Sequence, residues 1–136
     1  MGLFSGSRPN DLGVKNGRLK AVPGSPNAVS SQATDAAHRI DPLTYRTTPE
    51  RAMQALLEII RKTPRTRIVT ANADYVYAEY ESALMGFVDD VEFYFEPGAS
   101  VIQVRSASRV GYSDFGVNRK RIEDLRARLA AAGMSK

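Results

Sequence analysis

The segment from residue 90 to residue 106 constrains the fold of this chain more than any other part of its sequence. Residues 90–95 (DVEFYF) alternate so that the valine and both phenylalanines share one face of an extended strand. Residues 96–99 (EPGA) are typical of a hairpin turn, and residues 101–106 (VIQVRS) resume the alternation. The sequence therefore predicts an antiparallel hairpin with one apolar face that other elements must cover.

The register of this hairpin is restricted by its apolar residues. The two phenylalanines must share a face with Ile102 and Val104, and only two registers allow this. These registers place Arg105 opposite Glu92 or opposite Asp90, on the face away from the helices. We interpret the resulting ion pair as an exposed cross-strand pair that contributes little to stability, in preference to a functional carboxylate–arginine site.

Two amphipathic helices flank the strands. Thr48 and Pro49 suit the N-cap and first position of a helix that ends near Pro64. Asn118 is the predicted N-cap of a second helix, which stops at Gly133. We expect the apolar stripes of both helices to form one core with the hairpin, containing Leu56, Ile60, Phe93, Ile102, Val104, Ile122 and Leu125.

Two further strands are predicted at residues 67–71 and 75–83, and a leading strand is possible near residues 40–45. The expected fold is α+β, with two layers: an antiparallel sheet of four or possibly five strands and two helices. Its topology would be similar to that of the TATA-binding protein or of helix-grip proteins. We assign residues 48–133 to this domain and residues 1–47 to an irregular N-terminal arm.

The arm contains turn formers and spaced aliphatic residues. Its Gly, Pro, Ser and Asn residues predict irregular structure, whereas its leucines and valines need an apolar surface to pack on. We therefore expect residues 12–35 to pack over the sheet face opposite the helices. Some of the strand tyrosines must point to that face, the candidates being Tyr75, Tyr77, Tyr80 and Tyr94.

The net charge of +4 conceals an asymmetry along the chain. Residues 74–96 contain seven carboxylates and no Lys or Arg, whereas residues 105–136 contain eight cations and three carboxylates. We expect the fold to neutralise these two blocks against each other. A nucleic-acid surface is not expected, because Tyr112 and Phe115 are the only aromatic residues near the basic block.

Three separated segments occur in an order that points to a known family: residues 25–33 (SPNAVSSQA), 87–95 (FVDDVEFYF) and 105–123 (RSASRVGYSDFGVNRKRIE). Together they resemble the bacterial and plastid family called domain of unknown function 1499, over Leu12 to about Leu129. Its members often carry cysteines where this chain has Val22 and Ala28, so the resemblance implies no thiol chemistry here. The resemblance favours a function among the proteins of envelope or photosynthetic membranes.

Localisation is left open by the sequence. The first residues lack the basic and apolar regions of a signal peptide, and no apolar run approaches the ~18 residues that span a bilayer. We therefore expect a soluble chain, either cytoplasmic or peripheral to a photosynthetic or envelope membrane.

The start of the second helix concentrates cations where the helix dipole disfavours them. Arg119, Lys120 and Arg121 follow the predicted N-cap, so an anion should lie close by. A helix N-terminus with arginines and hydroxyls can bind a phosphate, a carboxylate or a partner. The candidate residues for such a site are Arg105, Arg109, Ser106, Ser108, Asp114, Asn118, Arg119 and Arg121.

The competing source of that anion is internal. Asp114 lies nearby in the sequence, and the paired carboxylate candidates Asp89, Asp90 and Glu92 belong to the acidic block. We favour internal pairing over an external anion, because structural ion networks are common at such places.

The leading functional interpretation is a non-enzymatic binding or accessory module that contacts a protein partner or a membrane-associated assembly. The alternative is a protein that binds a small anionic or lipid-like ligand. A hydrolase built on Ser30, His38 and Asp41 is a remote third possibility, because no nucleophile elbow or oxyanion motif accompanies these residues. We expect no cofactor and no metal, since cysteines are absent and no metal-ligand spacing occurs.

Overall fold

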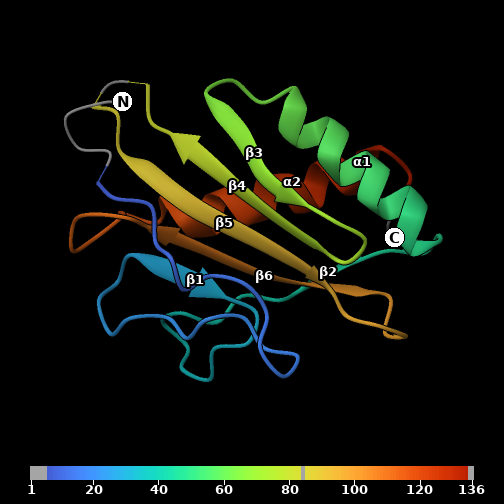
Figure 1. Cartoon of the computed structure of the whole chain (residues 1–136), viewed down its shortest axis with the longest axis horizontal. Coiled ribbons are helices and arrows are strands. Elements are labelled where there is room, and N and C mark those ends of the chain that lie inside the picture. The colour runs from blue at the N-terminus through green and yellow to red at the C-terminus, as the bar shows by residue number, and fades with distance from the viewer. Residues whose placement is uncertain (1–5, 84, 135–136) are drawn as a thin grey trace.

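Figure 1 shows the computed structural model of the chain, which describes residues 6–83 and 85–134. Within these residues it has two helices and six strands. In chain order they are β1 (Ala28–Ser30), β2 (Leu43–Thr44), α1 (Pro49–Arg61), β3 (Thr66–Ala71), β4 (Tyr75–Glu81), β5 (Val88–Phe95), β6 (Val101–Ser108) and α2 (Val117–Ala131). The predicted α+β class is confirmed; the correspondence to a named topology stays a prediction.

The strands form one open antiparallel sheet in the order β1-β6-β5-β4-β3, with β2 also pairing with β6. The strands β3 to β6 are the four predicted ones, and β2 lies within the predicted leading strand. β1 was not predicted, because three residues are too few for a recognisable alternation. It forms the edge of the sheet by pairing Ala28 with Ala107 and Ser30 with Arg105.

The hairpin of β5 and β6 adopts one of the two predicted registers. Glu92 lies opposite Arg105, and Phe93 lies opposite Val104. The alternation therefore directs every second side chain of β6 toward the helices and the others toward the opposite face.

Both helices cover the same face of the sheet, as Figure 1 shows for α1 in green and α2 in red. Thr48 caps α1 as predicted, since its hydroxyl oxygen accepts a hydrogen bond of 3.2 Å from the Arg51 backbone N–H. The core between helices and sheet contains all seven predicted residues: Leu56, Ile60, Phe93, Ile102, Val104, Ile122 and Leu125.

The start of α2 differs from the prediction. The helix begins at Val117 and follows Gly116, whose φ of +83° lies in the left-handed region. Asn118 is not the N-cap: it lies in the first turn and is fully buried. The N-cap assignment is wrong: Gly116 occupies the N-cap position and has no side chain to cap the helix. The Asp114 carboxylate, two residues earlier, accepts hydrogen bonds from the backbone N–H groups of Gly116 at 2.9 Å and Asn118 at 3.1 Å.

Residues 8–21 of the arm contact the sheet face opposite the helices, so the predicted packing of residues 12–35 over that face holds for its first part. The later part of the arm instead joins the sheet as β1 and β2, and Ile40, Leu43 and Tyr45 are buried in the core on the helix side. The Gly13 backbone N–H donates to Glu92 Oε2 at 2.8 Å, and Arg105 Nε donates to the Lys20 carbonyl at 3.0 Å. In Figure 1 the arm, in blue, crosses the sheet beside β5 and β6. We call this side of the sheet the arm face.

Candidate functional site

A network of ionised side chains fills the arm face, and Glu79 on β4 lies at its centre. The Glu79 carboxylate pairs with Arg8 of the arm at 2.7 Å, with Arg67 of β3 at 2.8 Å and with Arg109 at 2.7 Å. The Arg8 guanidinium, followed by those of Arg67 and Arg109, holds the pKa of Glu79 well below its usual range. This carboxylate therefore stays ionised and joins three chain segments.

Arg109 follows β6 directly, and its side chain is 3% exposed. Besides Glu79 it contacts Asp90 of β5 at 2.6 Å, and the Tyr77 hydroxyl donates to the same Asp90 at 2.5 Å. Its Nη1 group is buried and has no hydrogen-bond partner among the residues that the structure describes. A buried N–H group without a hydrogen-bond partner costs folding free energy, because it has lost its hydration.

Glu92 and Arg105 form a second, looser pair on the same face. Their closest atoms are 3.8 Å apart, while Glu92 is fully buried and Arg105 is 4% exposed. The prediction of an exposed ion pair is therefore wrong: the arm covers this face and excludes water from it. Burial raises the pKa of Glu92 and lowers that of Arg105, and the opposite charge 3.8 Å away offsets only part of this effect.

The predicted anion-site residues do not meet at one point, because the sheet separates them. Arg105 and Arg109 lie on the arm face. Ser106, Ser108, Asp114, Asn118 and Arg121 lie between the sheet and α2. Successive side chains of β6 point to opposite faces of the sheet, so Arg105 is separated from Ser106 and Ser108 although they are close in the sequence.

The group under α2 is satisfied internally. The Asn118 side-chain amide donates to Asp114, Ser108 and the Asn27 carbonyl, and its oxygen accepts from the Ser106 hydroxyl at 2.6 Å. The amide thereby ties α2 to β6 and to the arm. We interpret this cluster as structural.

Arg121 completes this cluster. It pairs with Asp89 at 2.7 Å and lies 4.7 Å from the centre of the Tyr80 ring. Burial raises the pKa of Asp89 despite the Arg121 charge, and burial raises that of Tyr80 to about 12. Together with Asp114 at the N-terminus of α2, Asp89 supplies the internal anions that the cationic first turn requires.

Arg119 points elsewhere and binds backbone carbonyls of the segment before β2. Its guanidinium donates to the Arg39 carbonyl at 2.9 Å and to the Ala37 carbonyl at 3.2 Å. This contact holds the loop that carries His38.

His38 is buried, and both of its ring nitrogens face acceptors. Nε2 lies 2.9 Å from the Ser25 carbonyl, and Nδ1 lies 2.5 Å from an Asp35 oxygen. The Ser25 carbonyl and then Asp35 raise the pKa of His38. The Ser30 hydroxyl accepts from the Gln32 backbone N–H instead, so no described contact links it to His38 in the manner of a catalytic relay.

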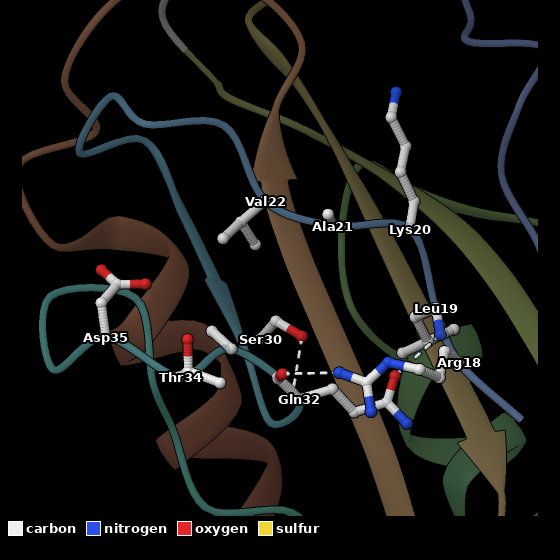
Figure 2. Close-up of a pocket in the computed structure, with 10 residues that line it drawn as sticks. Arg18, Leu19, Lys20, Ala21, Val22, Ser30, Gln32, Thr34 and Asp35 are labelled. Atoms are coloured by element: carbon white, nitrogen blue, oxygen red, sulfur yellow. Dashed lines mark hydrogen bonds between the residues drawn. The ribbon is translucent and has the colours of Figure 1, made fainter.

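Two cavities along the arm are each lined by several of its residues. The first, of about 300 Å³, separates residues 18–22 from residues 30–35. Figure 2 shows Arg18 reaching Gln32 across it, whereas Lys20 extends away from Ser30 and Gln32. Gln32 also accepts from the Leu19 backbone N–H at 2.7 Å and donates to the Gly17 carbonyl. The polar groups here are matched with one another, and they hold the arm to the loop.

The second cavity, of about 400 Å³, lies between the arm and the end of β6. We call it the arm cavity. Arg105 and Arg109 both line it, together with Leu12, Val22 and Ala107. It therefore combines two buried cations and the buried Asp90 carboxylate with apolar surface.

A different surface lies where β5 begins and β6 ends. Here the Arg109 backbone N–H donates to the Val88 carbonyl at 3.0 Å, so the loops before β5 and after β6 leave the sheet at the same end. Four of the five large apolar residues that are exposed in the described chain belong to these two loops, and the fifth, Val117, is the first residue of α2. The four are Met85, Phe87, Tyr112 and Phe115. We call this surface the apolar loop end.

Sequence reasoning missed the apolar loop end. It considered Tyr112 and Phe115 only as companions of a basic patch. The available signal was the segment GYSDFG, in which two aromatic residues stand among turn formers, away from any apolar periodicity.

Together these features define the chain as an α+β domain whose sheet is covered by helices on one face and by an ion-paired arm on the other. The chain belongs to the family described as protein of unknown function (DUF1499), whose model matches residues 18–129. This match confirms the family expected from the sequence. Neither a search of curated proteins nor one of solved structures finds a match. Among the described residues, no helix is long and apolar enough to cross a membrane.

Proposed function

We propose that this chain is a non-enzymatic docking module that binds a protein partner through the apolar loop end. The observation that carries the proposal is the exposure of aromatic side chains there: Phe115 is 93% exposed and Tyr112 is 74% exposed. Exposed aromatic side chains at one place are typical of the central anchors of protein interfaces.

The backbone supports this proposal. Phe115 has a φ of +53°, a conformation that costs a bulky residue about 1–3 kcal/mol and recurs at functional sites. Asp114 fixes the turn through its bonds to the Gly116 and Asn118 N–H groups. The ring of Phe115 is thus presented to solvent by a held loop.

Charge favours a protein over a lipid surface as the occupant. Most cations near this end are already matched: Arg67 and Arg109 with Glu79, and Arg121 with Asp89. Binding to anionic lipid draws on several unmatched Lys and Arg residues, each contributing about 1 kcal/mol.

The double variant Tyr112→Ser/Phe115→Ser tests the proposal. Expressed in its native source, the parent chain should elute in native gel filtration as part of a larger assembly, and the variant should elute as the free chain. Arg51→Ser/Gln54→Ser, at exposed positions of α1, is the matched control and should behave as the parent. Equal elution of parent and double variant would contradict the proposal.

A lipid occupant would give a different result. In that case the purified parent, but not the double variant, would sediment with vesicles of phosphatidylcholine and phosphatidylglycerol. That outcome would contradict a protein partner and would indicate that a membrane surface occupies the apolar loop end.

A further inference from the structure

The residues Asn16 and Gly17 form the tip of a tight turn in the arm, which the docking proposal does not use. The backbone groups of Lys15 and Arg18 bond to each other across this turn, at 2.9 and 3.0 Å. Asn16 and Gly17 have φ values of +53° and +74°, as the two central residues of a type I′ turn do. The pair suits the turn, and its chemical reactivity is a separate property.

The tip of the turn is open to solvent. Asn16 and Gly17 are exposed, and a Cβ built on Gly17 would meet no atom within 4 Å. Within the described chain, neither the Asn16 side-chain amide nor the Gly17 backbone N–H has a hydrogen-bond partner. Because no apolar packing holds the tip, it can open locally while the core stays folded.

These two unpartnered groups can react with each other. When the Gly17 nitrogen loses its proton, it attacks Asn16 Cγ, and the side-chain nitrogen of Asn16 leaves as ammonia. The product is a five-membered succinimide ring. Gly17 has no Cβ, so its backbone can approach Cγ closely. Water then adds to one of the two ring carbonyls and breaks its bond to the Gly17 nitrogen, which gives aspartate or isoaspartate.

Another asparagine of the chain provides an internal comparison. Asn72 is also exposed, but it precedes Ala73 and Asp74. The Ala73 Cβ hinders the attack, and Asn72 Oδ1 already accepts a hydrogen bond of 3.3 Å from the Asp74 backbone N–H. Negative charge develops during the attack, and the Asp74 carboxylate opposes it. Asn16 lacks these obstacles and should react faster.

The turn also positions contacts between the arm and Gln32. The Gly17 carbonyl accepts from Gln32 Nε2 at 3.0 Å, and the Leu19 backbone N–H donates to Gln32 Oε1 at 2.7 Å. The Arg18 guanidinium donates to the Gln32 carbonyl at 3.0 Å. Isoaspartate adds a methylene group to the backbone, so the two-residue turn that aligns these groups no longer closes in the same way.

We propose that Asn16 is a self-modification site, at which the folded chain forms isoaspartate without an enzyme, and that this conversion detaches residues 17–19 from Gln32. The proposal rests on the open turn, its two unpartnered groups and the contacts that follow it. It is independent of the apolar loop end, so either proposal can fail alone.

Incubation of the purified full chain at mildly alkaline pH, followed by peptide mapping with mass spectrometry, tests the modification. We expect deamidation at Asn16 to be at least about tenfold faster than at Asn72, with isoaspartate among the products. Equal or slower deamidation at Asn16, or aspartate as its sole product, would overturn the proposal.

Amide hydrogen exchange tests the structural consequence. In the isoaspartate-containing fraction, the Leu19 amide should exchange at least about tenfold faster than in the fresh chain. The Ser31 amide, bonded to Val104 of β6, should not change. Asn16→Gly is the matched control, because Gly-Gly also suits a type I′ turn, and its Leu19 amide should stay slow after the same incubation. Unchanged Leu19 exchange in the isoaspartate-containing chain would overturn the detachment from Gln32.

Discussion

At the scale of single residues, the buried ion pair of Asp90 and Arg109 should be very sensitive to a small chemical change. Both side chains are 3% exposed, and they lie 2.6 Å apart. Asp90→Asn keeps the size of the side chain but leaves Arg109 with Glu79 as its remaining carboxylate. Removing one partner of a buried pair costs about 3–5 kcal/mol, so the free energy of unfolding in urea should fall by roughly that amount.

The control for this prediction is Asp124→Asn, which breaks the exposed helical pair of Asp124 and Arg128. That change should alter the free energy of unfolding by about 0.5 kcal/mol or less. Equal effects of the two substitutions would mean that the arm-face network contributes no more than a surface pair.

His38 gives a pH-dependent prediction at the same scale. Its pKa is raised in the folded state, so its contribution to stability is full below the pKa of the unfolded chain, near 6.5. That contribution is lost as the pH rises through the raised folded pKa, when Nδ1 loses the proton shared with Asp35. The positive Arg119 nearby opposes the shift.

Urea unfolding measured at pH 6 and above the folded pKa of His38 checks this prediction. The parent should lose stability with rising pH relative to His38→Gln, in which this proton is absent. An identical pH profile for the two proteins would show that His38 does not titrate differently in the folded chain.

Residue pairing was predictable where it follows from alternation. The pairing of Glu92 with Arg105 was one of two registers allowed by the phenylalanines of β5. The burial of that pair was not predictable, because it depends on Gly13, which is 79 positions away and lies in an irregular segment. When an irregular segment covers a sheet face, no periodic pattern in the sequence predicts which residues it buries.

At the scale of elements, α2 depends on one apolar stripe and one polar cluster. Ile122, Leu125 and Leu129 are buried against the sheet, and Asn118 binds the polar atoms of β6. The stripe was predictable from its spacing. The role of Asn118 was not, since asparagine is a good N-cap and the carboxylate that accepts its backbone N–H, that of Asp114, lies four residues earlier and outside the helix.

Leu125→Ala tests the packing of this element. The side chain is 3% exposed in the core, so its truncation should lower the free energy of unfolding by about 2–5 kcal/mol. Thermal or urea unfolding measures the change, and Glu123→Ala, on the exposed side of the same helix, should have a small effect. A Leu125→Ala protein as stable as the parent would show that α2 does not pack as described.

At the scale of the whole molecule, the arm acts as part of the domain. Leu19 donates its backbone N–H to Gln32, and Ser31 donates its own to Val104 of β6 at 2.9 Å. The spaced aliphatic residues predicted that the arm packs on the domain. The cavities beneath it could not be predicted, since they depend on how irregular chain and side chains fit together.

Amide hydrogen exchange tests the integration of the arm. The amides of Gly13, Leu19 and Ser31 should exchange much more slowly than those of an unfolded peptide, because each is hydrogen-bonded to a distant residue. Exchange at unfolded rates across residues 12–35 would mean that the arm is not held on the sheet.

The docking role is tested most directly by a photo-crosslinking amino acid placed at position 115 in the native source. Position 54, exposed on α1, carries the same amino acid as the control. The apolar loop end should give a discrete crosslinked product that contains a second polypeptide, and position 54 should not. Three outcomes would contradict a protein partner at the apolar loop end. Position 115 could give no discrete product, position 54 could give the same product, or the product could contain only lipid.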